Sequence, residues 1–269
     1  MPRCLAPLCL AICALLAPPL AADPLEGAYE VEVLPGWRAK DGTHIAGVQI
    51  SLGAGWKTYW RAPGDAGIAP QFDWRASRNL SGVEIIWPTP KVLSQAGVQT
   101  IGYQGRVVLP LRVAALRDDR DVQLSGVLEI GVCKDVCLPV TIDLMQSLSA
   151  AETRPDPQIA AAMADRPYSA QEAGVGRVIC DIRPVKGGLA LRAEVDLDRI
   201  GAGEVAVVET DNPLIWVAQA ETRRDGGRLI AETEMYHSEG GAFALNRAGI
   251  RITVLGKSHA VDIQGCPAR

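Results

Sequence analysis

The sequence predicts an all-β protein made of two immunoglobulin-like β-sandwich domains joined by a short, partly helical linker. Three observations favour this fold. Short runs rich in Val, Ile and Leu recur along the chain and are broken by Gly, Pro and Asp, as in antiparallel sheets. One stretch rich in Ala, Pro and charge, 149–176, interrupts these runs. Gly-Gly pairs at 187–188 and 226–227 indicate tight turns between strands of the second half.

The first 22 residues have the order of a secretory signal peptide. An arginine near the start precedes an apolar stretch at 8–16, and small residues follow before Asp23. The apolar stretch is too short to span a bilayer, and Ile12 fits a lipid-anchoring cleavage before Cys13 poorly. We expect residues 1–22 to be removed, and the exported chain to contain no membrane span.

Charge and motifs exclude several classes of function. Removal of the signal leaves 26 basic and 31 acidic residues, a net charge of −5, with no basic run of the kind that binds nucleic acid. His44, His237 and His259 lie in unrelated segments without a neighbouring acid or cysteine. No phosphate-binding glycine loop and no Gly-x-Ser-x-Gly pattern occurs. A hydrolase is therefore disfavoured, and we expect no cofactor and no metal.

Residues 23–148 are predicted to form the first sandwich. Val48, Ile50 and Leu52 alternate with polar residues, the pattern of a strand with one buried face. Further strand-like runs occur at 83–87, 106–116, 122–132 and 141–144.

The segment 55–74 is rich in aromatic residues around the polar turn at 61–67. One interpretation is that the aromatic side chains belong to the sandwich core and that the turn is a surface loop. The other is that the loop covers a pair of cysteines farther along the chain and limits access to them. The residues of this predicted cover are Trp60, Arg61, Pro63 and Asp65.

The segment 149–176 is predicted to connect two domains. Its middle, from Asp156 to about Asp165, can form a short helix with Pro157 in the first turn and Pro167 beyond the end. The alternative is an excursion within one large domain.

Residues 177–269 are predicted to form a second, smaller sandwich, because short strand-like runs follow one another closely. These runs are 177–184, 188–197, 204–210, 214–224, 227–236, 249–256 and 259–265.

Four cysteines remain after the signal: Cys133, Cys137, Cys180 and Cys266. In an exported protein, disulfides are the default state of cysteines. Cys180 lies in the first strand of the second sandwich and Cys266 just past its last strand. Such a bond would close 85 intervening residues and contribute about 4 kcal/mol in the chain-entropy account. We expect Cys180 and Cys266 to form a structural disulfide.

Cys133 and Cys137 are predicted to face each other at the base of a hairpin. With three residues between them, a disulfide restricts the unfolded chain little, so its stabilising value is small. A weakly stabilising pair in an exposed polar turn is typical of a redox centre. Lys134 would favour a thiolate and Asp135 would oppose it, so the attacking cysteine stays open. Pro139 suits an exposed edge strand or loop.

Several segments, in order, resemble the periplasmic N-terminal domain of the thiol:disulfide interchange protein DsbD family, and more closely its ScsB-like, copper-sensitivity-suppressor members. The motifs that carry the resemblance are GWKTYWRAPGDAGIAPQFDW at 55–74, IGYQGRVVLPLRV at 101–113, GVCKDVCLPV at 131–140, CDIRP at 180–184 and DIQGCPA at 262–268.

The resemblance implies an immunoglobulin-like fold and a periplasmic thiol–disulfide exchange role. Cys133 and Cys137 match the family's active pair, which receives two electrons from a membrane-embedded thiol reductase and passes them to periplasmic thioredoxin-like proteins. The spacing of three between the cysteines is narrower than the spacing in DsbD itself. This chain carries neither a multi-helix membrane domain nor a thioredoxin-like domain, so the resemblance implies a separate membrane reductase as donor.

Two other functions stay open. The two thiolates could hold Cu(I) in a copper-binding or copper-tolerance module. Alternatively, both disulfides could be inert parts of a structural double sandwich. Whether the protein is itself an enzyme, as a component of a protein-disulfide reductase, is also left open.

Overall fold

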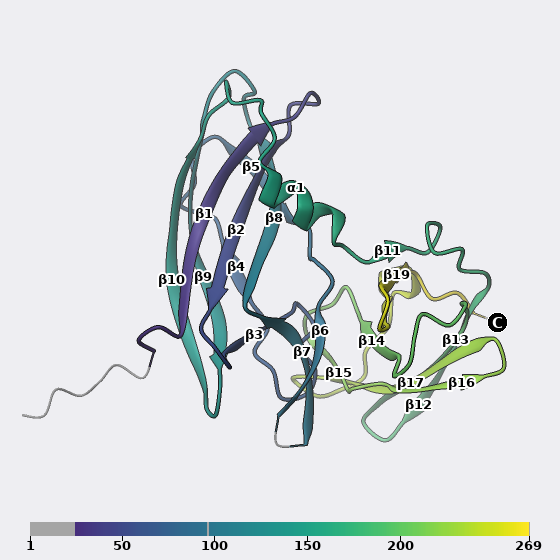
Figure 1. Ribbon diagram of the computed structural model, residues 1–269. Helices are drawn as coiled ribbons and strands as arrows, with labels where there is room; N and C mark the ends of the chain where they lie inside the picture. The colour runs from purple at the N-terminus through teal and green to yellow at the C-terminus, as the bar shows by residue number, and fades with distance from the viewer. Residues whose placement is uncertain (1–24, 96, 269) are drawn as a thin grey trace, which may run out of the picture.

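The computed structural model describes residues 25–95 and 97–268, so the predicted signal peptide at 1–22 lies outside the described residues. The regular structure is almost entirely β-strand, arranged in four sheets, and the predicted all-β double sandwich is confirmed (Figure 1). Among the described residues, strand pairing is antiparallel except between β11 (Tyr168–Ser169) and β19 (Ala260–Gln264), which are parallel. Within 25–95 and 97–268, no helix is long and apolar enough to cross a membrane.

The first sandwich is made of two sheets that face each other. One sheet has the order β1 (Tyr29–Arg38), β2 (His44–Leu52), β8 (Arg106–Ala115), β5 (Leu80–Ile85). The other has the order β10 (Cys137–Leu148), β9 (Val122–Cys133), β3 (Lys57–Tyr59), β7 (Val98–Gln104), β6 (Lys91–Gln95), and β4 (Gln71–Asp73) also pairs with β9.

The strand β2 is more buried than its sequence pattern indicates. Its apolar residues enter the core, but Gln49 on the opposite face is buried as well and donates to Glu32 at 2.5 Å. The helix α1 (Pro157–Ala164) covers part of this outer face, where Ile159 packs near Gly47. A strand covered on both faces loses the alternation in burial that the sequence predicts.

The predicted linker helix is confirmed. Asp156 caps the N-terminus of α1, because its carboxylate accepts from the backbone N–H groups of Gln158 and Ile159. Pro157 occupies the first helical position, where its missing N–H costs nothing. Packing of Ile159 against β2 and β8 then holds the helix on the first sandwich.

The second sandwich also consists of two sheets. One has the order β11 (Tyr168–Ser169), β19 (Ala260–Gln264), β18 (Arg251–Leu255), β14 (Val205–Glu209). The other has the order β12 (Val178–Val185), β13 (Gly188–Asp196), β17 (Arg228–His237), β15 (Ile215–Val217), and β16 (Glu221–Asp225) also pairs with β17. A short 3-10 helix, Arg247–Gly249, precedes β18.

The predicted Gly-Gly turns of the second sandwich are confirmed. Gly187 and Gly226 have φ angles of 79° and 59°, a conformation that favours glycine, and they join β12 to β13 and β16 to β17.

The predicted strand run 214–224 is split into β15 and β16. Between these strands the backbone N–H of Gln219 donates to the carboxylate of Asp65, which lies in the first sandwich. A contact with the first sandwich therefore lies where a run that reads as continuous in the sequence is interrupted.

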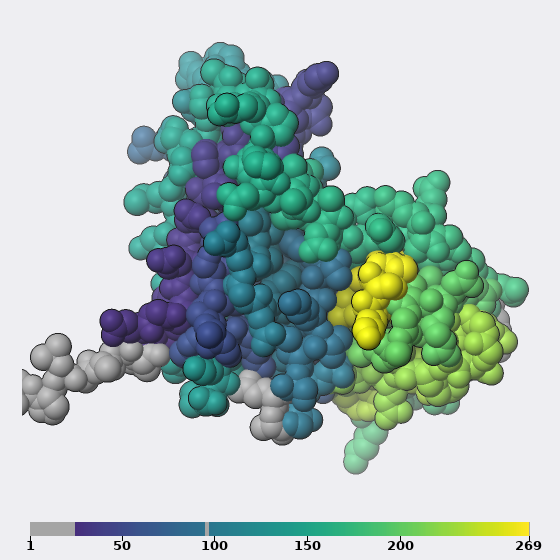
Figure 2. All heavy atoms as spheres, in the orientation of Figure 1, coloured from purple at the N-terminus to yellow at the C-terminus, as the bar shows by residue number. Residues whose placement is uncertain are grey.

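The two sandwiches pack directly against each other (Figures 1 and 2). Leu255 and Ala260 of the second sandwich are buried in the same apolar cluster as the core of the first, so the contact is apolar at its centre. The C-terminal residues, yellow in Figure 2, lie where the halves meet. We propose that the chain divides at 149–176 as expected, because α1 packs on the first sandwich and β11 joins the second.

Candidate functional site

The two cysteines of the candidate site lie at the end of the β9–β10 hairpin. Cys133 and Cys137 are opposite each other in the strand register and are joined by a disulfide. The intervening Lys134, Asp135 and Val136 are exposed. The strand β10 forms the edge of its sheet, which leaves Pro139 exposed on an edge strand as the sequence predicts.

The two sulfur-bearing residues differ sharply in accessibility. Cys133 is 0% exposed, whereas Cys137 belongs to the exposed residues of the hairpin end. Of the two residues, Cys137 is therefore the one that is open to solvent, while Cys133 is shielded. The sequence gives no signal for this difference, because three intervening residues do not determine which cysteine is exposed.

A tyrosine hydroxyl contacts both sulfurs. The Oη atom of Tyr59 lies 3.0 Å from Cys133 Sγ and 3.1 Å from Cys137 Sγ. Burial raises the pKa of Tyr59, so its hydroxyl stays protonated and can donate to sulfur. The site therefore holds a hydrogen-bond donor in place for a thiolate before one forms.

The strand β3 brings Tyr59 to this position. Lys57 is the direct partner of Cys133 in the β3–β9 register. Because side chains alternate along a strand, Tyr59 projects from the same face as Lys57, two residues farther from the hairpin end. Thr58 fixes the alignment of the strands, since its hydroxyl donates to the carbonyl of Gly131 at 2.9 Å.

Two glycines leave room for the Tyr59 ring. A Cβ atom at Gly131 would lie 3.0 Å from Tyr59 Cε2 and 2.8 Å from Ile68 Cβ. A Cβ atom at Gly67 would lie 2.9 Å from Tyr59 Cδ1 and 2.2 Å from Pro63 Cβ. The loop 61–69 thus lies close over the ring, and Ile68 reaches the strand that carries Cys133.

The predicted cover residues contact other parts of the molecule. Trp60 is fully buried in the core of the first sandwich. The carbonyl of Pro63 accepts from the backbone N–H of Ile101 at 2.9 Å, which ties the loop to β7.

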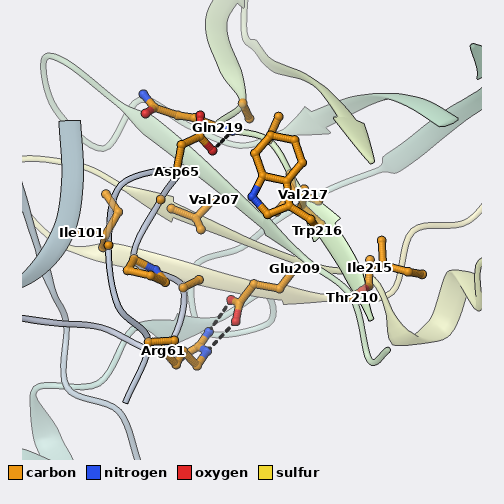
Figure 3. A pocket seen from close by; sticks show the side chains of 18 of the residues that line it. Arg61, Asp65, Ile101, Val207, Glu209, Thr210, Ile215, Trp216, Val217 and Gln219 are labelled. Carbon is orange, nitrogen blue, oxygen red and sulfur yellow. Dashed lines mark hydrogen bonds and ion pairs between the residues drawn. The ribbon is translucent and has the colours of Figure 1, made fainter. Parts of the chain in front are cut away.

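Arg61 and Asp65 reach across to the second sandwich (Figure 3). The Arg61 guanidinium forms two hydrogen bonds of 2.9 Å with the carboxylate of Glu209. It also donates to the Thr253 hydroxyl at 3.3 Å, and the centroid of the Trp60 ring lies 3.9 Å away. The Asp65 carboxylate accepts from the backbone N–H of Gln219 at 3.0 Å. These residues hold the loop, whereas the side chain that contacts the sulfurs is Tyr59.

The sequence missed Tyr59 and Lys57 as neighbours of the cysteines. A signal for them does exist, since they occupy alternate positions of a short strand-like run. However, this pattern points to the cysteines only if the strand is known to pair with β9. The residues of a three-residue strand do not identify its partner.

A cavity of about 490 Å³ lies between the loop 61–67 and the open edges of β14 and β15 (Figure 3). Apolar side chains such as Ile101, Val207 and Trp216 line much of it, together with the Arg61–Glu209 pair. Neither cysteine of the hairpin lines this cavity. It belongs to the contact between the sandwiches.

The second cysteine pair has a different environment. Cys180 and Cys266 are joined by a disulfide, and each is 1% exposed. The backbone N–H of Cys180 donates to the carbonyl of Pro267, and Arg247 donates to the carbonyls of both cysteines. This bond ties the first strand of the second sandwich to the end of the chain and is shielded from other thiols.

No group of three or more His, Cys, Asp or Glu side chains within residues 25–95 and 97–268 is arranged to hold a metal ion.

Comparisons with known proteins agree with this geometry. The family described as "Thiol:disulfide interchange protein DsbD, N-terminal" matches residues 30–148. The crystal structure of the N-terminal periplasmic domain of ScsB from Proteus mirabilis superimposes with a TM-score of 0.67 at 23% sequence identity. That superposition covers 93% of this chain and 97% of the ScsB chain, so the fold is shared across both sandwiches. The comparison with curated proteins found no match.

The family match includes β3 with Tyr59 and the whole cysteine hairpin. The predicted resemblance is thus confirmed: residues 30–148 match the model of the DsbD N-terminal family.

Proposed function

We propose that the protein is a periplasmic thiol–disulfide exchange protein that relays electrons through Cys133 and Cys137. The observation that carries this proposal is the asymmetry of the pair: an exposed Cys137, a buried Cys133, and one tyrosine hydroxyl in contact with both. The family match over residues 30–148 supports the same chemistry.

In the direction that delivers electrons, the reduced protein acts on the disulfide of a thioredoxin-like partner. The Cys137 thiolate attacks one partner sulfur, a mixed disulfide forms, and the other partner sulfur leaves as a thiolate. The Cys133 thiolate then attacks Cys137 Sγ. This step closes the Cys133–Cys137 bond and releases the second partner thiolate, so that two electrons have passed to the partner.

In the direction that receives electrons, a dithiol of a membrane-embedded reductase attacks the exposed Cys137. Cys133 leaves as a thiolate, and the Tyr59 hydroxyl lies 3.0 Å from its sulfur, in position to donate a hydrogen bond. The second thiolate of the reductase then attacks the reductase sulfur that is bonded to Cys137. This step closes a disulfide in the reductase and frees Cys137 as a thiolate. The reductase becomes oxidised, and the pair becomes a dithiol.

The location and partners follow from the same proposal. The signal-like segment 1–22 would direct the chain to the periplasm, the compartment of the similar ScsB domain. The electron donor would be a separate membrane reductase and the acceptor a thioredoxin-like protein. In this scheme Cys180–Cys266 is structural, as its burial supports.

The reduction potential of the Cys133–Cys137 pair tests the proposal. In graded dithiol buffers, alkylation followed by mass spectrometry of the peptides reads this pair separately from Cys180–Cys266. We expect a value between about −120 and −270 mV, the range of exchange proteins. A value below about −300 mV would mark the bond as structural and would overturn the proposal.

Trapping tests which sulfur meets the partner. A Cys133→Ala variant keeps the exposed Cys137 and is expected to accumulate a mixed disulfide with an oxidised thioredoxin-like protein. The matched Cys137→Ala variant keeps only the buried sulfur and is expected to accumulate much less. Equal trapping by both variants would contradict the assignment of Cys137 as the attacking residue.

A further inference from the structure

Lys57 is a buried cation beside the cysteine site. Its side chain is 5% exposed. Its Nζ atom donates to Thr100 Oγ1 at 3.1 Å and lies 5.6 Å from the centroid of the Tyr59 ring. Within 25–95 and 97–268, no carboxylate forms an ion pair with it. Burial accordingly lowers the pKa of Lys57, with no opposing effect from a counter-charge.

A buried ammonium with a hydroxyl and an aromatic face as its partners is costly to keep. An uncharged side chain of the same length could fill this space, so packing alone does not explain why a lysine occupies position 57. The cost would be offset if a negative charge formed nearby at some stage of the reaction. The thiolate of Cys133 is such a charge.

The strand register places Lys57 opposite Cys133 on β9, and its ammonium reaches Thr100 on β7, the other neighbour of β3. Lys57 and Cys133 are direct partners across β3 and β9, so their side chains project from the same face of the sheet. The Tyr59 ring lies next to both: its centroid is 5.6 Å from the ammonium and its hydroxyl is 3.0 Å from Cys133 Sγ.

Other charged groups near the hairpin are on its exposed side. Lys134 and Asp135 belong to the exposed turn, and Glu129 is exposed on β9. Water screens these charges, so each affects a buried sulfur weakly.

On the loop that covers Tyr59, both charged side chains already have partners. Arg61 is paired with Glu209, and Asp65 accepts from Gln219. Lys57 differs from all of these groups because it is buried and has no counter-charge among the described residues.

We propose that Lys57 is a positioning residue that stabilises the Cys133 thiolate whenever the disulfide opens. Its charge acts directly through a poorly screened region, and it also makes the Tyr59 hydroxyl a stronger donor, since a cation near the ring draws electron density from it. Cys133 thereby becomes a better leaving group when a reductant attacks Cys137. This inference rests on the proposed function, because it concerns the same two sulfurs.

The test replaces Lys57 with methionine, which keeps length and removes charge. In a Cys137→Ala background, Cys133 is the free thiol, and its ionisation is followed by ultraviolet thiolate absorbance against pH. We expect Lys57→Met to raise the pKa of Cys133 by about one unit, a tenfold change in its acid dissociation constant. With both cysteines present, we expect a dithiol to reduce the disulfide more slowly than in the wild type.

Lys134→Met is the matched control, since Lys134 is adjacent to Cys133 in sequence but exposed. It should shift the pKa of Cys133 much less than Lys57→Met. Lys57→Arg keeps the charge and should leave the pKa of Cys133 close to the wild-type value. If Lys57 only filled space, the arginine variant would not differ from the neutral variants in this way. Lys57→Gln provides a second neutral variant if the methionine variant does not fold.

An unchanged Cys133 pKa in a folded neutral variant would overturn the inference, and so would a larger effect of Lys134→Met. These outcomes are separate from failure of the proposed function. The thiolate pKa can be measured even if the wild-type pair proves too reducing for exchange, and a normal exchange potential leaves the role of Lys57 to be decided by the variants.

Discussion

At the scale of single residues, the site depends on glycines that allow neighbouring side chains to approach the backbone closely. Gly131 faces both Tyr59 and Ile68 at distances shorter than a side chain tolerates. The two contacts fix the ring between the strand that carries Cys133 and the covering loop. A methyl group at this position would compete with the hydrogen bonds from Tyr59 to the sulfurs.

We therefore expect Gly131→Ala to lower the free energy of unfolding by about 1–3 kcal/mol, the usual cost of overpacking. Displacement of Tyr59 should also speed alkylation of Cys133 in the reduced protein. Denaturant unfolding and timed alkylation measure the two effects. Gly82→Ala is the control, because no atom lies within 4 Å of a Cβ there and its φ angle is not positive. Equal behaviour of the two variants would show that the ring has room to move.

The sequence predicts the pairing of Cys133 with Cys137 but not the chemical surroundings of the pair. The hairpin is local, so three intervening residues suffice to place Cys133 opposite Cys137. The contacts of Tyr59 join residues 74 and 78 positions apart. Lys134 is the thiolate-stabilising candidate by proximity in the chain, yet it is exposed, whereas Lys57 is buried beside the site.

At the scale of elements, the loop 61–69 connects the cysteine site to the second sandwich. One part is held by Glu209 and Gln219, and the other part packs on Tyr59 and on Gly131 of β9. Loss of the contacts with Glu209 and Gln219 would therefore also loosen the packing of the loop on Tyr59. The second sandwich therefore supports the cover of a site that it does not itself contain.

We expect a Glu209→Gln, Asp65→Asn double variant to loosen this loop. The Arg61–Glu209 pair is largely shielded, with the side chains 14% and 19% exposed, so breaking it leaves a poorly solvated guanidinium. Alkylation of Cys133 in the reduced protein should become faster by about threefold, the effect of roughly 0.7 kcal/mol in loop closure.

The control for the loop variant is Arg75→Ala, which removes an ion pair with Asp73 whose side chains are 90% and 42% exposed. Such a surface pair contributes little, so alkylation should stay at the wild-type rate. If the double variant also reacts at the wild-type rate, the loop does not depend on the second sandwich.

Elements that depend on local sequence were predictable, whereas features that depend on contacts between the sandwiches were not. The linker helix follows from Asp156 and Pro157, which begin it through local hydrogen bonding and backbone geometry. The run 214–224 is divided where Gln219 contacts Asp65, a residue more than 150 positions away along the chain. Of the predicted cover residues, Arg61 and Asp65 likewise take part in this contact.

At the scale of the whole molecule, the two disulfides should respond differently to reductant. Cys137 is exposed, whereas both members of Cys180–Cys266 are buried. With increasing dithiol under native conditions, we expect a species with two alkylated thiols before one with four. Intact-mass measurement distinguishes these species. First labelling of Cys180 and Cys266 would contradict the assigned roles.

Removal of the buried bond should destabilise the fold without abolishing exchange. A Cys180→Ala, Cys266→Ala variant loses the constraint on 85 intervening residues, about 4 kcal/mol in the chain-entropy account. Its denaturation midpoint should fall, while the potential of Cys133–Cys137 should stay near the wild-type value. A large change in that potential would indicate that the second sandwich tunes the sulfurs directly.

The fold class was predictable for the whole molecule, because short apolar runs and glycine turns extend along both halves. The way the halves pack was not, since Leu255 and Ala260 read as ordinary strand residues of the second sandwich. Only the folded chain reveals that they are buried with the core of the first.

This shared apolar cluster bears on how the protein can be divided. A fragment that ends at residue 148 would expose to water the side chains that Leu255 and Ala260 now cover. Such a fragment would also lose the helix α1 and the partner of Arg61. The apolar area left open would favour self-association. Expression of the cysteine-bearing half alone would therefore call for polar replacements on that face.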